Sequence, residues 1–509
     1  MTRTADQGPA PGSGEFTPET ELLYKIPIGY ARRHLLLPCR GPEGELVLLA
    51  GDPGDSFAID ETRFLVGPAR VVEMPGDAIR KMIDSAYERV QTPEREIVEG
   101  LSGEWELDVE AAIEETRDLL ESPDEGPVIK FVHSLIFRAI RERSSDIHIE
   151  PFEKELLIRN RIDGVLYPMV TAPRKWHAPV VSRIKVMAGL DIAERRLPQD
   201  GRIRIRVGGN EIDIRVSVVP TAYGERAVLR ILDRSSLLLG LEDIGLDPAD
   251  LAVVLRLLAR SNGILLVTGP TGSGKTTTLY GALRRLDSGT KNIITIEDPI
   301  EYQIRGIGQI QVNPKIQLTF ASGLRSILRQ DPDIIMVGEI RDPETAEIAI
   351  QASLTGHLVL STLHTNDSSS AVTRLVDMGI EPFLVASSLT AVIAQRLVRR
   401  LCSDCRTPYS PTEEQWREIG LPGTPSGTFY RSAGCPACMG TGYRGRAGIF
   451  EILVVDDRLR TLILTRADSE GIKEQARARG MRTILASGAA KIREGVTSVE
   501  EVLRVTREE

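Results

Sequence analysis

The stretch Gly269-Pro-Thr-Gly-Ser-Gly-Lys-Thr276 decides the fold that much of this sequence must adopt. It fits the pattern G-x-x-x-x-G-K-[ST], in which glycines let backbone N–H groups gather round phosphate oxygens. An apolar run, 264–268, precedes it, and a run with helical propensity, 275–287, follows it. This order of strand, loop and helix favours a phosphate-binding loop over a glycine-rich turn that matches the pattern by chance.

The residues of this loop have expected parts in binding a nucleoside triphosphate and Mg²⁺. The N-terminus of the following helix adds partial positive charge beside the phosphates. Lys275 is expected to reach the β- and γ-phosphates, and the Thr276 hydroxyl is expected to ligate Mg²⁺. The predicted nucleotide-binding residues are Gly269, Pro270, Thr271, Gly272, Ser273, Gly274, Lys275, Thr276 and Thr277.

Two further apolar runs, 292–296 and 333–337, lead into acidic residues. Alternation of such strands with helical stretches predicts a mainly parallel sheet with helices on both faces, and chemistry collects at the carboxyl ends of its strands. We therefore expect Glu339 to orient or deprotonate an attacking water. Glu297 and Asp298 are expected to help hold Mg²⁺ through water or to polarise that water. The alternative for each acid is a helix cap or a salt-bridge partner.

Two histidines, His357 and His364, bracket the apolar run 358–363. A single histidine usually has a structural role. A pair at the two ends of a strand beside a phosphate site also fits a sensor of the bound nucleotide. Both interpretations stay open on the sequence.

The composition restricts the class of protein. The chain has 509 residues, a formal net charge of −9 and a pI of about 5.5. This length predicts roughly three domains. The overall basic footprint of a nucleic-acid-binding protein is missing. We expect no membrane span, because charged and polar residues interrupt the most apolar stretches, and no signal peptide, because residues 1–19 lack an apolar segment.

Changes in composition and in apolar periodicity along the chain indicate its domains. We expect a disordered tail at 1–18, an N-terminal docking domain at 19–110, a linker at 111–126, a second domain at 127–240, and a C-terminal domain at 241–509 that contains a four-cysteine module at 398–442. Asp247 and Pro248 are expected to open the first helix of the last domain, and Gly263 to close it. Thr497-Ser-Val-Glu500 reads as a capping box that opens a final helix.

A charged hairpin lies in the second domain, where the runs 202–207 and 210–217 both alternate with period two. If Gly208-Gly209 forms the turn, Arg206 faces Glu211, Arg204 faces Asp213, and Arg202 faces Arg215. The last pair brings like charges together, which destabilises the sheet unless an anion lies nearby. This face either meets nucleotide phosphate or is an ordinary solvated surface.

The cysteines form two close pairs, Cys402-Ser-Asp-Cys405 and Cys435-Pro-Ala-Cys438. Zinc prefers four thiolates in a tetrahedron, and each pair supplies two, so we expect a structural Zn²⁺ with no open coordination position. The competing interpretation is a redox pair. Cys39 is left over as a small buried residue. Arg444 and Arg446, in the glycine-rich loop that follows, either reach a phosphate or face solvent.

Together these motifs resemble the secretion ATPase superfamily. The phosphate-binding loop, Ile296-Glu-Asp-Pro299, Val337-Gly-Glu-Ile-Arg-Asp342 and the stretch from Gly356-His357 to His364-Thr-Asn366 occur in family order. Upstream, Ser145-Asp-Ile-His-Ile-Glu-Pro151, Arg161-Ile-Asp-Gly164 and Leu197-Pro-Gln-Asp-Gly201 match the second domain of that family. Ile28-Gly-Tyr-Ala-Arg-Arg-His34 resembles the N-terminal region of the type II secretion assembly ATPases. The resemblance covers about residues 21–509.

The resemblance implies an α/β fold: a RecA-like ATPase domain with a mainly parallel sheet, preceded by a PAS-like α+β domain and a small N-terminal α/β domain. It implies a homohexamer that hydrolyses ATP to drive pseudopilus assembly and protein export. Its phosphate-contacting arginines match Arg161, Arg215, Arg230 and Arg446. The expected partners are the cytoplasmic domain of the L-type anchor and the F-type platform protein, on the cytoplasmic face of the bacterial inner membrane. The expected cofactors are ATP, Mg²⁺ and structural Zn²⁺.

Three rival functions share parts of this pattern. A type IV pilus extension ATPase has the same catalytic residues and the cysteine module, which the retraction type lacks. A nucleic-acid translocase would grip a strand with its zinc module, but the acidic pI and the lack of a basic, aromatic stripe argue against it. A non-catalytic nucleotide sensor fits poorly with the intact Lys275, Thr276 and Glu339.

Overall fold

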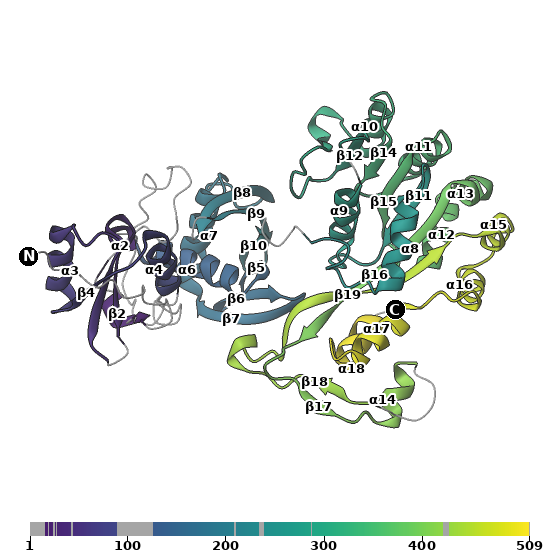
Figure 1. Ribbon diagram of the computed structural model, residues 1–509. Coiled ribbons are helices and arrows are strands. Elements are labelled where there is room, and N and C mark those ends of the chain that lie inside the picture. Colours follow the sequence, from purple (N-terminus) through teal and green to yellow (C-terminus); the bar gives the residue numbers. More distant parts are fainter. Residues whose placement is uncertain are drawn as a thin grey trace, which may run out of the picture. The chain divides into compact units, whose positions relative to one another are not determined.

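The computed structural model describes residues 16–18, 20–23, 26, 28–41, 44–88, 126–207, 210–233, 239–286, 288–420 and 427–507. The chain divides into two compact units, Met1–Asp233 and Arg234–Glu509 (Figure 1). Each unit is built round cores of its own. The linker expected at 111–126, except for Gly126, and the turn at 208–209 lie outside the described residues.

The first part of unit Met1–Asp233 is a four-stranded sheet of order β1-β2-β3-β4 with short helices. Its elements are β1 Thr17–Pro18, α1 Thr20–Leu23, α2 Ile28–His34, β2 Leu36–Arg40, β3 Leu46–Ala50, α3 Ser56–Val66, β4 Arg70–Glu73 and α4 Gly76–Glu88. Cys39 is fully buried in this core, and burial raises its pKa to about 12. The structured chain begins before residue 19, because Phe16 is buried and Thr17 pairs with Arg40.

The second part of this unit is a six-stranded antiparallel sheet of order β7-β6-β5-β10-β9-β8. Its elements are α6 Pro127–Arg141, β5 Ser144–Pro151, β6 Glu155–Ile162, β7 Val165–Pro173, η2 Arg174–Trp176, α7 His177–Met187, β8 Gln199–Val207, β9 Asn210–Thr221 and β10 Gly224–Asp233. The apolar residues of α6 and α7 pack with the alternate apolar residues of the strands. Period-two alternation therefore puts the charged residues of the strands on the opposite face.

The unit Arg234–Glu509 contains a seven-stranded sheet of order β13-β12-β14-β15-β11-β16-β19. Its strands are β11 Gly263–Thr268, β12 Ile293–Glu297, β13 Gly308–Gln311, β14 Ile334–Val337, β15 Leu358–Leu363, β16 Leu389–Leu401 and β19 Tyr443–Val454. Neighbouring strands are parallel except β16 and β19. The mainly parallel sheet predicted from the sequence is confirmed.

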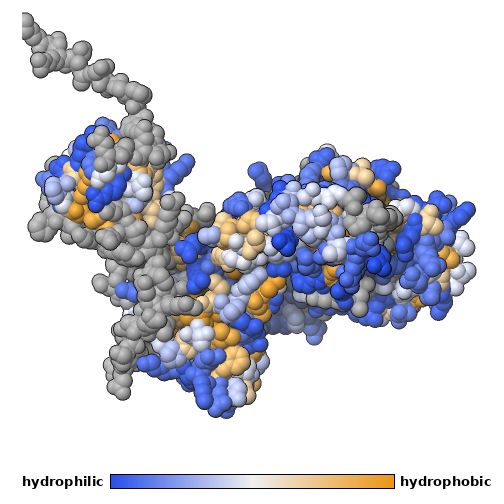
Figure 2. Space-filling model, turned by 90° about the horizontal axis from the view of Figure 1, so that it is seen from below, coloured by the Kyte–Doolittle hydropathy of each residue, from blue (hydrophilic) through white to orange (hydrophobic). Residues whose placement is uncertain are grey.

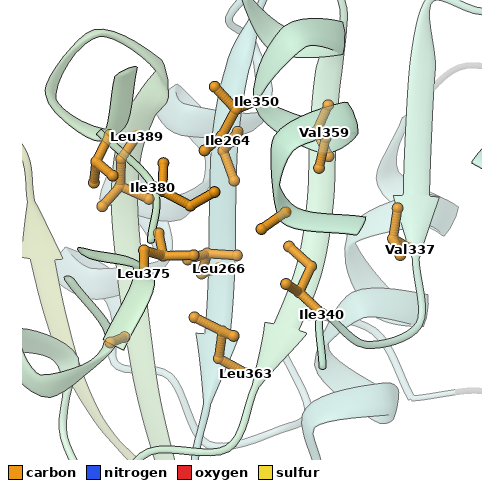
Figure 3. Packing of buried hydrophobic residues seen from close by; sticks show 14 of the residues in the cluster. Ile264, Leu266, Val337, Ile340, Ile350, Val359, Leu363, Leu375, Ile380 and Leu389 are labelled. Carbon is orange, nitrogen blue, oxygen red and sulfur yellow. The ribbon is translucent and has the colours of Figure 1, made fainter. Parts of the chain in front are cut away.

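Helices cover both faces of this sheet, so its central strands β11, β12, β14 and β15 are buried on each side. Ile264 and Leu266 of β11 pack in one core (Figure 3), and Leu265 and Val267 pack in the other. The helices are α8 Pro248–Leu258, α9 Lys275–Arg285, η3 Pro314–Ile316, α10 Phe320–Ile327, α11 Pro343–Leu354, α12 Ser368–Asp377, α13 Pro382–Ser388, α15 Asp457–Leu464, α16 Ser469–Ala478, α17 Ile484–Arg493 and α18 Val499–Thr506.

Two expected helix boundaries in this unit are wrong. Helix α8 ends at Leu258, and Gly263 instead begins β11. Glycine is needed there for close approach, since a Cβ on it would lie 2.3 Å from Thr390 Cγ2. Helix α18 is capped by Ser498, one residue after the predicted cap, because the Ser498 hydroxyl accepts the Glu501 N–H.

The cysteine module is an excursion between β16 and β19. It contains β17 Thr407–Tyr409, α14 Glu413–Glu418, β18 Phe429–Arg431 and η4 Pro436–Cys438.

The face shown in Figure 2 is mostly hydrophilic, with hydrophobic residues in small groups. Among the described residues, no helix is both long and apolar enough to cross a bilayer.

Candidate nucleotide-binding site

The loop between β11 and α9 has the geometry of a phosphate cradle. Gly272 and Gly274 have φ values of 80° and 87°, which glycine adopts more readily than other residues. Gly274 directly precedes the first helical residue, Lys275. The N–H groups of this first helical turn therefore face the concave side of the loop, where an anion is favoured.

Two buried side chains in this loop favour the binding of a phosphate group. The Lys275 ammonium donates to the carbonyl oxygens of Gly269 at 2.8 Å and Pro270 at 3.1 Å. Burial lowers the pKa of Lys275, while the nearby Glu339 carboxylate opposes this shift. The Ser273 hydroxyl is buried without a hydrogen-bond partner. A buried cation and a buried polar atom with no partner both gain from phosphate oxygens.

Glu339 follows β14 and lies where the sequence placed it, at the carboxyl edge of the sheet. Its carboxylate accepts a hydrogen bond from Arg341 Nε at 2.7 Å and lies 3.0 Å from His364 Nε2. The carboxylate is mostly buried, with 15 % of the side chain exposed. Burial lowers the pKa of His364, the positive charge of Lys275 lowers it further, and Glu339 opposes both effects.

Glu297 ends β12 at the same edge and is almost fully buried. Its carboxylate accepts hydrogen bonds from the hydroxyls of Tyr280 and Thr295, the latter at 2.5 Å, and from Gln309 Nε2 at 3.1 Å. Burial beside this carboxylate raises the pKa of Tyr280 far above its usual value. In this arrangement the protein itself holds Glu297, whereas the neighbouring Asp298 is exposed.

The two histidines lie at opposite ends of β15. Six residues of parallel strand separate them, a span of roughly 20 Å. His364 joins Glu339, but His357 Nδ1 lies 2.7 Å from the Ala352 carbonyl and 3.2 Å from the Thr355 hydroxyl. His357 is therefore at the sheet edge away from the phosphate loop.

Of the arginines expected to contact phosphate, Arg161, Arg215 and Arg230 lie in unit Met1–Asp233, and Arg446 lies in unit Arg234–Glu509 with the phosphate loop. The register of β8 and β9 is the one read from the sequence, with Arg202 opposite Arg215. Arg215 is also opposite Arg230 on β10. Arg230 Nε lies 2.9 Å from Asp146, which also lies 3.6 Å from Arg161 Nε.

These residues form a row across adjacent strands with one acid among the arginines, which we call the arginine row: Arg161, Asp146, Arg230, Arg215 and Arg202. The site within unit Arg234–Glu509 is built without this row. Arg446 lies on β19 of that unit, is exposed, and pairs in register with Arg399.

The four cysteine sulfurs lie within 4.8 Å of one another. The sulfurs of Cys402 and Cys435 are 3.9 Å apart, those of Cys405 and Cys438 3.8 Å, and those of Cys435 and Cys438 3.7 Å. A tetrahedral zinc with about 2.3 Å bonds separates its sulfurs by about 3.8 Å. The donor set therefore fits Zn²⁺. The backbone N–H groups of Gly434 and Gly442 donate to the sulfurs of Cys405 and Cys438, and such donors stabilise metal-bound thiolates.

Several residues that support the site have no role predicted from the sequence. Arg341 lies within Val337-Gly-Glu-Ile-Arg-Asp342, but the motif by itself predicts no role for it. Tyr280 and Gln309 carried no signal, because only folding brings them to Glu297. Thr268, just before the loop, has its hydroxyl 2.7 Å from that of Thr365, which follows His364. This contact joins the end of β11 to the segment after β15.

Comparison with known proteins gives matches over nearly the whole chain. A model described as "Type II/IV secretion system protein" matches residues 121–504, and one described as "MshEN domain" matches residues 9–93. A Pseudomonas aeruginosa protein named "Type II secretion system protein E" is 50% identical over 95% of this chain and 97% of its own length. The Myxococcus xanthus "Type IV pilus assembly ATPase PilB" is 46% identical over 97% of this chain and 88% of its own.

A solved structure, that of the Legionella pneumophila ATPase DotB, has a TM-score of 0.56 to this chain. It is 21% identical, and the match covers 77% of this chain and 100% of that one. This likeness concerns the fold alone.

Proposed function

Because this chain belongs to the family of type II/IV secretion system proteins and is an ATPase of type II protein secretion, we propose the following roles for its residues in ATP hydrolysis. One observation supports the proposal most. The phosphate loop and the buried acid Glu339 meet at one edge of the sheet, where the Glu339 charge acts on Lys275. The phosphate loop and Glu339 are thus close enough to act on the same triphosphate.

We propose that the loop binds the phosphates and that Glu339 directs the attacking water. Lys275 leaves its two carbonyl partners and neutralises the β- and γ-phosphates, as the loop N–H groups do. Thr276, exposed at the start of α9, would hold Mg²⁺ through its hydroxyl. The Glu339 carboxylate accepts a hydrogen bond from the water, and Arg341 and His364 keep it in place. When bound, Mg²⁺ supplies positive charge against the developing charge of the phosphoryl group.

The second acid has a supporting part in this proposal. Tyr280, Thr295 and Gln309 hold Glu297 at the end of β12, where its carboxylate would help hold Mg²⁺ through water or polarise that water. Asp298 shares this task. His364 senses the γ-phosphate through Glu339, and His357 senses the same event at the far end of β15.

We propose that the arginines supply the remaining charge. Arg161, Arg215 and Arg230 of the arginine row, with Arg446 of β19, contact the γ-phosphate as arginine fingers do. The like-charged pair Arg202 and Arg215 supports this role, because an anion between neighbouring arginines removes their repulsion. Hydrolysis then removes the anion and lets the two units move.

The proposed machine is a homohexamer on the cytoplasmic face of the inner membrane. Its residues 19–110 dock to the cytoplasmic domain of an L-type anchor, and the ring drives an F-type platform protein. The module at 398–442 carries a structural Zn²⁺. The similarity to a pilus assembly ATPase favours a second candidate, pilus extension, which shares the chemistry and differs in the partner.

The test is ATP turnover by the whole chain, alone and with the cytoplasmic domain of the type II anchor. We expect the anchor domain to raise turnover at least fivefold. Glu339→Gln should bind ATP but hydrolyse it about 10²-fold or more slowly, because a general base contributes about that factor. Lys275→Ala should lose nucleotide binding. Normal turnover in Glu339→Gln would refute the proposed role, and stimulation by a pilus platform protein alone would favour the second candidate.

A further inference from the structure

Two glycines of the phosphate loop face the same residue, Gln395 of β16. A Cβ on Gly269 would lie 2.4 Å from the Gln395 carbonyl oxygen, and a Cβ on Gly274 would lie 2.8 Å from Gln395 Nε2. The atom beside Gly269 is backbone, so this distance excludes a side chain there, and a Cβ at Gly274 would displace the Gln395 amide. The loop is therefore packed directly on Gln395.

Gln395 is also bonded to the helix that follows the loop. The Thr278 hydroxyl donates to Gln395 Oε1 at 2.6 Å, and the two side chains are 2% and 1% exposed. Strand β16 runs parallel to β11, with Ala394 opposite Thr268. The amide thus connects β16 to α9 directly behind the loop that β11 enters.

We infer that Gln395 is a positioning residue for the phosphate-binding loop. This inference rests on the proposed function, since it takes the loop to bind nucleotide phosphate. Hydrogen bonds to phosphate weaken steeply with distance and angle. The Gln395 backbone carbonyl lies against Gly269 and its side-chain amide lies against Gly274, and together they fix how far the loop stands from β16. Nucleotide affinity therefore depends on a side chain behind the loop.

The same strand offers a matched control. Thr390 of β16 is also buried, bonds across to β11 through its hydroxyl at 2.7 Å from Ile264 O, and also packs against a glycine, Gly263. It lies at the opposite end of the strand from the loop. Loss of the Thr390 hydroxyl therefore costs stability of the same kind without reaching the phosphate site.

The experiment measures the Kd of ADP by calorimetry for the full-length chain with Gln395→Met or Thr390→Val, with thermal unfolding followed for both. Methionine keeps the length of the side chain and removes the amide. We expect Gln395→Met to raise the Kd about tenfold and Thr390→Val to change it less than twofold. An unchanged Kd in folded Gln395→Met would overturn the inference. A wild-type chain that binds no ADP would overturn the proposed function and this inference with it.

A second variant separates positioning from general loss of packing. Gln395→Glu keeps an acceptor for the Thr278 hydroxyl but brings a carboxylate against the backbone of Gly274. As pH rises and this carboxylate ionises, its charge repels the phosphates. We expect the ratio of its Kd to that of the wild type to increase with pH, and a ratio that stays constant would count against a place beside the phosphates.

Discussion

At the residue scale, Glu297 shows how far the role of an acid depends on its neighbours. The carboxylate is buried and accepts hydrogen bonds from side chains on three different segments, α9, β12 and β13. A buried charge is stable only when such donors surround it. Tyr280, on the helix that follows the phosphate loop, is therefore a link between the nucleotide site and this acid.

Tyr280→Phe tests that link. Removing the hydroxyl takes one donor from a buried carboxylate, so we expect the free energy of unfolding to fall by about 1–3 kcal/mol. We also expect kcat to fall more than nucleotide affinity, because Glu297 is held less firmly. Chemical denaturation and steady-state kinetics measure the two effects.

A matched control is Tyr443→Phe, whose hydroxyl lies 2.8 Å from the neutral Ser498 hydroxyl. Its loss should cost about 0.5–1.5 kcal/mol, since neutral hydrogen bonds contribute less, and should leave kcat unchanged. Equal losses of stability in the two variants would contradict a stronger contribution from the hydrogen bond between Tyr280 and Glu297.

At the scale of elements, the hairpin of β8 and β9 carries Arg202 and Arg215 of the arginine row together with oppositely charged cross-strand pairs. Arg206 lies 3.3 Å from Glu211, and Arg204 is opposite Asp213, whereas Arg202 is opposite Arg215. The cross-strand pairs at the turn end are thus balanced, and the charge excess gathers at the other end. This asymmetry is what an anion-binding face needs and what a merely solvated face does not require.

Arg215→Ala should slow ATP hydrolysis at least tenfold with less than a threefold change in the Kd of ADP, because the arginine acts on the γ-phosphate. Arg206→Ala, on the same hairpin, should change neither quantity, since the exposed pair with Glu211 contributes little. Steady-state turnover and equilibrium binding give the comparison. Wild-type turnover in a folded Arg215→Ala chain would contradict the proposed contact with the γ-phosphate and would favour the alternative, an ordinary solvated surface.

The cysteine module is the second element whose role can be tested directly. Metal analysis of the purified chain should return about one zinc per chain. Cys435→Ser should lose the metal and make residues 398–442 sensitive to protease, because metal binding is coupled to folding of such modules. Cys39→Ser should keep its zinc, since Cys39 is buried in a different core. A folded wild-type chain without metal would contradict the site.

At the scale of the whole molecule, the residues proposed to act on ATP belong to both units of the chain. The phosphate loop and Glu339 lie in unit Arg234–Glu509, and the arginine row lies in unit Met1–Asp233. Under the proposed function, a variant in either unit is therefore expected to change ATP turnover.

The proposed ring gives a prediction at this scale. With ATP bound, Glu339→Gln should sediment as six chains of 55.9 kDa, because slow hydrolysis holds the closed state. Wild-type turnover per chain should rise with protein concentration, since association completes the sites. Analytical ultracentrifugation and a dilution series of the ATPase rate measure these effects. A single chain at every concentration, with constant turnover per chain, would refute the ring.

The sequence by itself determined the sheet, the loop and the register of the hairpin. Each depends on local pattern: glycine spacing for the loop, apolar runs for the buried strands, and period-two alternation for Arg202 and Arg215. The cysteine cluster also followed, because two close pairs of thiols have few other uses. Two helix ends do not follow from the sequence. A glycine such as Gly263 can either stop a helix or allow two strands to approach, and in Thr497-Ser498 either hydroxyl could cap the last helix.

Only the tertiary structure decided which side chains support the site. Gln395 lies more than a hundred residues from the loop in sequence, yet its amide contacts Thr278 at 2.6 Å, and nothing local marks it. Tyr280 and Gln309 reach Glu297 only after β12 and β13 are in register with α9 packed near them. His357 and His364 look equivalent as a pair, but a strand between them sends one to each edge of the sheet. Contacts across strands depend on topology, which short-range pattern does not contain.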